Sequence, residues 1–302
     1  MNILTYVRPI FVLVTGATGK QGGSVVKALL DYGHRVRGLT RTPNSEKAKL
    51  LEEEGVDIVK GDFNDPDSTR KAMKNVDAVF LMGTSFEEGV EGEIKHGITV
   101  AEIAKEEGIK HLVYTSVSSA NKNTGVPHFD SKFKIEEHVR NIGIPYTIIR
   151  PVSFMENYLA PWTLPKLKEG IIEGPTAPDR KSQLIAVRDI GRFALHVFEN
   201  REHFLGKAID IASDELSGNE ISELFSHALG YRVSYHQLDT EALKTRGEMF
   251  LKMYQWARDV GYDVNIDTLR SDFPKVGWTR FKDWVNEQDW KALTKPVEQA
   301  II

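Results

Sequence analysis

The sequence of 302 residues contains no cysteine. This absence excludes disulfide bonds, thiolate nucleophiles and metal sites with cysteine ligands. The sequence also has no apolar run close to the roughly 20 residues that a membrane-spanning helix requires. The apolar run before Gly16 is short and follows Pro9, which is not the pattern of a secretory signal. We therefore expect a soluble, cytoplasmic protein without a membrane partner.

Excess positive charge is missing as well. The net charge is −4, from 39 basic and 43 acidic residues, and no dense run of Lys and Arg occurs. Direct binding of nucleic acid is therefore not expected. The 9 histidines are scattered, and no pair has the spacing of metal ligands with a carboxylate nearby, so we expect no metal site. The hydrophobic content of 41% is sufficient for one large or two medium domains.

The most informative stretch is a glycine-rich corner near the start of the chain. A short apolar strand (Ile10–Val14) leads into Gly16, Ala17, Thr18, Gly19, Lys20, Gln21 and Gly22, and a helical pattern follows. In such a triplet the first glycine permits a tight turn, the second lets the backbone approach a pyrophosphate, and the third lets the helix pack closely on the strand. The N–H groups and positive dipole end of the helix then face an anion. This stretch predicts a dinucleotide site.

A strand–helix alternation continues to about residue 150. The apolar patterns predict six strands, at residues 10–14, 36–39, 56–59, 77–82, 111–116 and 146–150. They predict five helices, at 21–32, 45–54, after the cap Asp65 with Pro66, at about 91–107, and at about 129–141. Right-handed crossovers then give an α/β, Rossmann-type doubly wound parallel sheet with the strand order 3-2-1-4-5-6.

The regular alternation of strand and helix patterns ends after Pro151. Residues 151–182 contain many prolines and glycines, which predicts mostly loop with short helices. Residues 184–200 and 207–212 return to strand, helix and strand, the motif from Ser217 to Glu220 predicts a capping box, and the remainder is expected to be rich in helices. We therefore expect a dinucleotide-binding domain of residues 1–150 plus about 184–212. A smaller, helix-rich domain for a substrate or partner would comprise 151–183 and 213–302.

The ends of the second, third and fourth strands carry the next candidates. Arg41 stands about 20 residues beyond the glycines, where an NAD site usually has a carboxylate for the ribose. A cation there suits the 2′-phosphate of NADP(H), although a solvated surface arginine has the same pattern. Asp62 and Phe63 would contact the adenine, or else form a turn and join the core. Gly83 and Thr84 end the fourth strand at the predicted cofactor edge.

Several motifs together resemble the NmrA-like family of atypical short-chain dehydrogenases/reductases. They are GATGKQGGSVV, LTR at 39–41, GDF at 61–63, VYTS at 113–116, HFDSK at 128–132 and RPVSFMEN at 150–157. The resemblance implies an NADP(H)-preferring Rossmann domain, a small helical C-terminal domain and a cleft between them. Some members of this family are redox sensors or transcriptional co-regulators that bind the nucleotide without turnover. Related proteins are reductases, including enzymes of the quinone and isoflavone types.

The resemblance also assigns residues. Family enzymes carry Tyr-x-x-x-Lys, in which the lysine holds the nicotinamide ribose and lowers the pKa of the proton-donating tyrosine. Here the spacing is kept as His128 and Lys132, without the tyrosine. His128 is then either a replacement proton donor or a histidine at a helix start. Ser116 matches the family serine that orients a carbonyl, and its alternative role is to cap a turn.

The remaining assignments concern the two ends of the cofactor. Lys95 matches a lysine that reaches the cofactor, or it is a solvated helix residue. A second basic residue after Arg41 is absent, and Ser45 is left to bind a phosphate. Phe154, Glu156 and Asn157 match the segment that passes the nicotinamide. We expect an NADP(H)-binding redox sensor or regulator, or alternatively an NADPH-dependent reductase of a quinone, enone or other small carbonyl compound. A small-molecule substrate or a protein partner would occupy the cleft, and a homodimer is left open.

Overall fold

The computed structural model describes residues 8–83, 85–239, 243–244 and 247–294. The chain divides into two units. The first comprises the described residues of Met1–Pro151 together with Val187–Ile211 and Asp272–Gly277. The second comprises those of Val152–Ala186, Ala212–Ser271 and Trp278–Ile302.

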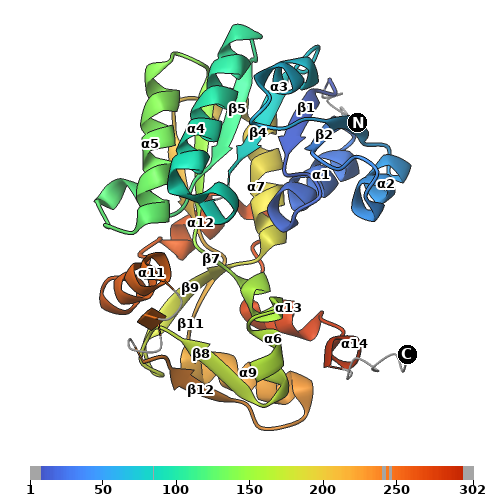
Figure 1. Ribbon diagram of the computed structural model, residues 1–302. Coiled ribbons are helices and arrows are strands. Elements are labelled where there is room, and N and C mark those ends of the chain that lie inside the picture. The colour runs from blue at the N-terminus through green and yellow to red at the C-terminus, as the bar shows by residue number, and fades with distance from the viewer. Residues whose placement is uncertain (1–7, 84, 240–242, 245–246, 295–302) are drawn as a thin grey trace, which may run out of the picture. The chain divides into compact units, whose positions relative to one another are not determined.

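The first unit contains a seven-stranded parallel sheet (Figure 1). Its strands run in the order β10-β6-β5-β4-β1-β2-β3, which confirms the predicted order 3-2-1-4-5-6 and adds a seventh strand beside the sixth. The strands are β1 (Phe11–Thr15), β2 (Arg35–Thr40), β3 (Asp57–Lys60), β4 (Ala78–Met82), β5 (His111–Thr115), β6 (Tyr146–Pro151) and β10 (Ala208–Ile211). Because all are parallel, their carboxyl ends lie along one edge of the sheet, where ligands of this fold bind.

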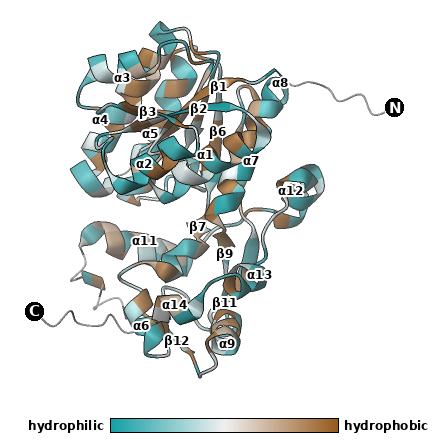
Figure 2. Ribbon diagram, turned by 90° about the vertical axis from the view of Figure 1, so that its right-hand side faces the viewer, coloured by the Kyte–Doolittle hydropathy of each residue, from teal (hydrophilic) through white to brown (hydrophobic). Residues whose placement is uncertain are grey.

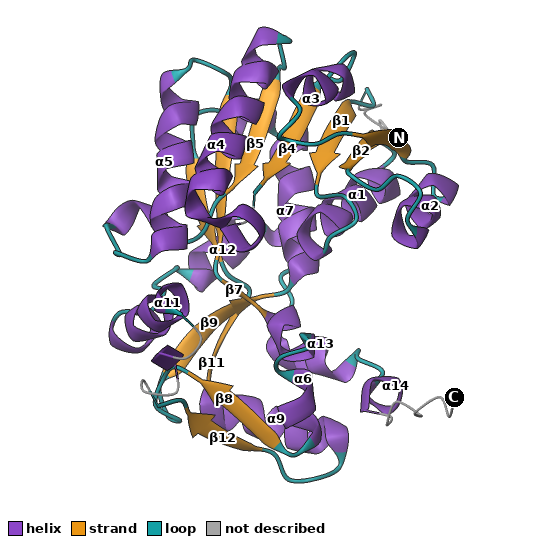
Figure 3. Cartoon of the chain, viewed as in Figure 1, coloured by secondary structure: helices purple, strands orange, loops and turns teal. Residues whose placement is uncertain are grey.

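Helices cover both faces of the sheet, as the purple helices on either side of the orange strands in Figure 3 show. Helix α4 packs against α3 and α5, and α1 packs against α7. The helices of this unit are α1 (Lys20–Tyr32), α2 (Glu46–Glu53), α3 (Pro66–Ala72), α4 (Ser85–Glu106), η1 (Ala120–Lys122), α5 (Pro127–Asn141), α7 (Val187–Glu199), α8 (Arg201–Phe204) and η3 (Pro274–Val276).

The core explains why the central strands are mostly apolar. Every residue of β1 and β5 is buried, because both faces of each strand are covered. Leu13, Leu81 and Leu112 pack with Val100 of α4 and Ile135 of α5 in one cluster. Figure 2 shows this concentration of hydrophobic residues on the central strands and on the helix faces that meet them.

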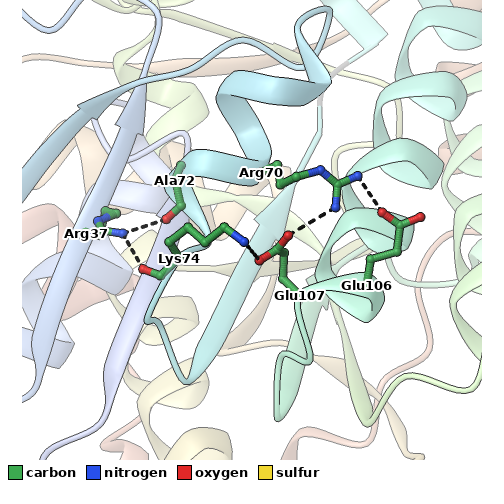
Figure 4. Close-up of polar contacts among 6 residues, drawn as sticks. All are labelled: Arg37, Arg70, Ala72, Lys74, Glu106 and Glu107. Carbon is green, nitrogen blue, oxygen red and sulfur yellow. Dashed lines mark hydrogen bonds and ion pairs between the residues drawn. The ribbon is translucent and has the colours of Figure 1, made fainter.

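Charged groups join β2 to the end of α3, and α3 to the end of α4 (Figure 4). The Arg37 guanidinium of β2 donates to the carbonyl oxygens of Ala72 and Lys74, each at 2.9 Å, and so caps the C-terminal end of α3. Lys74 and Arg70 both pair with Glu107 just beyond α4, at 2.6 and 3.2 Å. These contacts fix helix ends, whereas the hydrophobic cluster supplies the packing.

The second unit has two small sheets. One has the order β11-β9-β7 and the other pairs β12 with β8. The elements are β7 (Ser153–Phe154), η2 (Met155–Leu159), α6 (Leu164–Lys168), β8 (Ile171–Gly174), β9 (Lys181–Ile185), β11 (Asp214–Ser217), α9 (Gly218–Leu229), β12 (Ser234–Gln237), α11 (Glu248–Asp259), α12 (Ile266–Asp272), α13 (Phe281–Asn286) and α14 (Trp290–Thr294). Its core joins Phe225, Phe281 and Trp284.

The helix-rich character of this C-terminal region was expected, but its sheets were not. Residues 151–182 contain β7, β8 and the start of β9, where the sequence predicts mostly loop. Gly170 precedes β8 and Gly174 ends it, yet the strand forms because β12, about sixty residues later, supplies its hydrogen-bonding partner. The capping box is confirmed: the Ser217 hydroxyl accepts from the Glu220 N–H at 3.2 Å, and the Glu220 carboxylate accepts from the Ser217 N–H. Within the described ranges, no helix combines the length and apolar character needed to cross a membrane.

Candidate functional site

The glycine-rich corner joins β1 to α1 at the carboxyl edge of the main sheet. Gly16 has a φ of 63°, a conformation that glycine adopts without strain, and its carbonyl accepts from the Gly19 N–H at 2.9 Å. At Gly22, an added Cβ would overlap the Gly16 carbonyl and lie 2.8 Å from the Thr15 oxygen. The third glycine therefore lets α1 start directly against the end of β1.

The first turn of α1 is suited to an anion. Gly19 is the N-cap, and as a glycine it has no side chain that could hydrogen-bond to the first N–H groups of the helix. The first N–H groups of a helix have no partner within the helix, and they carry the positive end of its dipole. A pyrophosphate at this corner would satisfy them, so the residues present fit a dinucleotide.

Side chains hold the corner in place. The Thr15 hydroxyl accepts from the Met82 N–H at 2.9 Å and so ties the end of β1 to the end of β4. The Thr115 hydroxyl donates to the Gln21 side-chain oxygen at 2.6 Å, which ties α1 to the end of β5. Ala17 is buried, and Lys20 is exposed. The predicted loop residues thus lie together at one edge.

At the end of β2, the structure places Arg41 in an ion pair. Its guanidinium contacts the Glu87 carboxylate at two points, Nη1–Oε2 at 2.9 Å and Nη2–Oε1 at 3.0 Å. Ser45 caps α2 and accepts from the Ala48 N–H at 3.3 Å. The predicted phosphate-binding side chains therefore both have protein partners in this structure.

At the end of β3, Asp62 and Phe63 take the structural roles that the sequence left open. The Asp62 carboxylate accepts from the Asn64 N–H at 2.9 Å, which forms a turn. The Phe63 ring lies 5.8 Å from the His96 ring of α4 and packs against the core. Their predicted contact with the adenine stays a prediction.

Lys132 lies in a polar cluster at the end of β4. Its ammonium is 2.6 Å from Glu93 Oε1 and donates to the Gly83 carbonyl at 3.3 Å. The Ser131 hydroxyl donates to the other Glu93 oxygen at 2.7 Å. The Glu93 side chain is 0% exposed, so this carboxylate is neutralised by Lys132 inside the protein.

Sequence reasoning missed Glu93, although a signal was present. Glu93 precedes Gly97, Val100 and Ala104, which are all buried on α4. It therefore lies on the core-facing stripe of an amphipathic helix, where a carboxylate requires a partner. Lys95, predicted to reach the cofactor, is exposed on the same helix.

The end of β5 presents a buried hydroxyl. Ser116 is only 5% exposed, and its hydroxyl has no hydrogen-bond partner among the described residues. Buried polar atoms are normally satisfied, so this hydroxyl is available to a ligand group. Its position directly after β5 places it on the ligand-binding edge of the sheet.

His128 is the second residue of α5, which begins at Pro127. Burial, together with the nearby Lys132 charge, lowers the pKa of His128 to about 4. The imidazole is therefore neutral near pH 7, where a cationic proton donor would be needed. This argues against the prediction that His128 replaces the family tyrosine as a proton donor.

Two histidines, the buried His111 and the partly buried His128, should make the protein sensitive to acid. Burial also lowers the pKa of His111, to about 3, whereas an unfolded histidine titrates near 6.5. Below that pH the unfolded chain binds protons that the native state does not, so stability falls by up to about 1.4 kcal/mol per pH unit for each histidine. When the pH changes from 6.5 to 5, we expect the free energy of unfolding of His128→Phe to fall by up to about 2 kcal/mol less than that of the parent protein. Urea unfolding at the two pH values measures this difference. An equal loss in both proteins would contradict the partly buried, neutral state of His128.

Three predicted residues lie in the second unit. Phe154 belongs to β7 and pairs with Ile185 of β9. The Glu156 carboxylate accepts from the Trp284 indole at 3.1 Å, and the Asn157 amide donates to the Ser153 hydroxyl at 3.4 Å. Thr84 lies outside the described residues. Over the described part of the chain, no group of three or more His, Asp or Glu residues could hold a metal ion.

Comparison with known proteins agrees with this fold. The profile of the NmrA-like family matches residues 10–285. An NmrA-like family domain-containing protein of Dictyostelium discoideum is 33% identical, over 76% of this chain and 80% of the relative. The NmrA-like family domain-containing oxidoreductase malD of Malbranchea aurantiaca is 30% identical, over 92% and 96%.

Two solved structures share the fold at low identity. Triphenylmethane reductase of Citrobacter sp., complexed with NADP(H), aligns with a TM-score of 0.78 at 21% identity, covering 91% of this chain and 99% of that one. Nmra, a negative transcriptional regulator, was solved in complex with NAD and aligns with a TM-score of 0.74 at 22% identity, covering 93% and 95%. The same regulator has also been solved with NADP.

Proposed function

Since the chain belongs to the NmrA-like family, we propose that it binds NADP(H) at the glycine corner and acts as a redox sensor that responds to the NADPH/NADP⁺ ratio. The first turn of α1, whose N-cap Gly19 has no side chain and which Gly22 places directly against β1, carries the binding proposal. Arg41 at the end of β2 supports NADP(H) over NAD(H), because its guanidinium can bind a 2′-phosphate.

The residues have distinct tasks in this proposal. The N–H groups of α1 bind the pyrophosphate, and Lys132, fixed by Glu93, holds the ribose next to the nicotinamide. Ser116 offers its buried hydroxyl to the same end of the cofactor. When bound, the nicotinamide supplies or accepts hydride.

The state of His128 favours a sensor over an enzyme that protonates its product. With a pKa of about 4, this imidazole gives no cationic donor at neutral pH where the family enzymes have tyrosine. The bound nucleotide would then change the affinity for a protein partner through a shift between conformations. A second copy of this chain is one candidate for that partner.

A reductase is the second candidate, and the similarity to an oxidoreductase over 92% of this chain supports it. Its substrate would be a quinone, enone or other small carbonyl compound. Quinones and enones need less proton donation from the protein than simple carbonyl compounds do. NADPH oxidation should be followed with a panel of quinones and enones, and rapid turnover with several of them would favour the reductase and contradict a pure sensor.

Calorimetric titration with NADPH, NADP⁺ and NADH tests the binding proposal. We expect Arg41→Ala to weaken NADPH about tenfold, the loss of one hydrogen-bonded charge pair, and to change NADH much less. Arg35→Ala is the matched control, because Arg35 lies at the opposite end of β2. Absence of binding by all three nucleotides would refute the proposal.

A further inference from the structure

The Arg41–Glu87 pair has the geometry of a phosphate contact. Two guanidinium nitrogens meet two carboxylate oxygens at 2.9 and 3.0 Å, the two-point arrangement that a guanidinium also makes with phosphate. The side chains are 57% and 52% exposed, so the pair contributes little to the stability of the fold. Arg41 lies at the end of β2, where the proposed function places the 2′-phosphate.

Glu87 lies on a short segment that is separate from the body of α4. The helical geometry breaks at Glu88 and Gly89, and Gly89 has φ 72° and ψ −176°, a conformation accessible essentially to glycine alone. The turn from Ser85 to Glu88 therefore takes its own direction, and its carboxylates do not follow the face of the long helix.

A second contact attaches this turn to the end of β3. The Asn64 amide donates to Glu88 Oε1 at 2.8 Å, and His96 lies 3.0 Å from the Asn64 side-chain oxygen. Together with Arg41, these contacts connect the turn to the loops that follow β2 and β3. In a doubly wound sheet, the adenosine half of a dinucleotide lies over these loops.

We infer that Glu87 competes with the 2′-phosphate of NADP(H) for the Arg41 guanidinium, and so limits the preference of this protein for NADP(H) over NAD(H). The inference rests on the proposed function. NAD(H) carries a hydroxyl at this position and does not need to displace Glu87. NADP(H) must displace it, and its phosphate is also repelled by the released carboxylate.

The residues after Arg41 make this competition direct. The chain continues with Thr42, Pro43 and Asn44, so the segment offers no second cation to bind Glu87 while Arg41 binds phosphate. Within residues 41–44, Arg41 is therefore the cation that both the carboxylate and the phosphate can bind, and Glu87 already contacts both of its Nη atoms.

Glu87→Gln tests the inference, because it removes the charge and keeps the size of the side chain. We expect NADPH and 2′,5′-ADP to bind about three- to tenfold more tightly, which corresponds to one exposed, well-oriented ion pair. NADH and 5′-AMP should change by less than about twofold, since they lack the 2′-phosphate. Isothermal titration calorimetry at low ionic strength measures all four ligands.

Two further variants separate direct competition from a general effect of charge. Glu91→Gln makes the same change of charge at an exposed position further along α4 and should leave all four affinities unchanged. In the double variant Arg41→Ala/Glu87→Gln, the gain for NADPH should disappear.

The outcomes distinguish a failure of the inference from a failure of the proposed function on which it rests. If NADPH and NADH bind the parent protein and Glu87→Gln leaves their ratio unchanged, the inference is wrong and the binding function stands. An equal gain from Glu91→Gln also contradicts direct competition. If neither nucleotide binds either protein, the proposed function fails, and the inference fails with it.

Discussion

Glu136→Gln is expected to lower the free energy of unfolding by about 3–5 kcal/mol, the usual cost of breaking a buried ion pair, because the buried Arg150 would then keep only its longer contact to Asp210, at 3.5 Å, among the ion pairs of the described residues. The Glu136 side chain is 0% exposed and accepts from Arg150 Nε at 2.9 Å and Arg150 Nη2 at 2.6 Å. Arg140 adds a third contact at 2.7 Å. The pair joins α5 to β6, so its loss affects packing next to the sheet as well as charge.

Urea denaturation at neutral pH measures this effect. Glu106→Gln is the matched control, because it breaks an ion pair with Arg70 whose side chains are 57% and 37% exposed. We expect the control to cost less than about 1 kcal/mol. A similar, small loss in both variants would show that burial does not determine the strength of these ion pairs.

Gly22→Ala should affect both stability and ligand binding. The new Cβ would overlap backbone atoms of Gly16, which cannot move aside like a flexible side chain, so α1 must shift away from β1. We expect a stability loss of about 1–3 kcal/mol, typical of overpacking. The shift displaces the N–H groups that face the phosphates, and losing one charged hydrogen bond corresponds to roughly ten- to hundredfold weaker NADPH binding.

Gly23→Ala is the control for this experiment. Its Cβ would lie 3.2 Å from the Ala17 oxygen, a close approach that a small adjustment relieves, and alanine favours the helix. Thermal unfolding and calorimetric titration should show nearly parental values for Gly23→Ala. Normal NADPH affinity in a folded Gly22→Ala variant would show that the dinucleotide does not bind at this corner.

Much of the first unit could be predicted because its signals are local. The apolar run of β1 and the glycines after it are within one stretch of chain, and the predicted strand order was confirmed. The resemblance to the NmrA-like family was confirmed as well. The small sheets of the second unit could not be predicted, because β8 acquires its partner only from β12, far along the chain.

In the candidate site as well, local sequence singled out individual residues but not their distant partners. Its motif singled out Lys132 as a candidate, whereas the buried partner Glu93 lies 39 positions earlier on another helix. The distance to the glycines singled out Arg41 as a candidate, but it did not predict the ion pair with Glu87, 46 positions later. His128 was weighed as a proton donor, and its low pKa follows from burial that no local pattern reports.

The sequence by itself determined the order of the elements, the glycine corner and the family, because hydrophobic period, caps and glycine spacing act over a few residues. Tertiary structure alone decided which charges meet: Glu93 with Lys132, Glu136 with Arg150, and Glu87 with Arg41. The physical reason is that the energy of a charge depends on its burial and its neighbours, and both are set by parts of the chain distant in sequence.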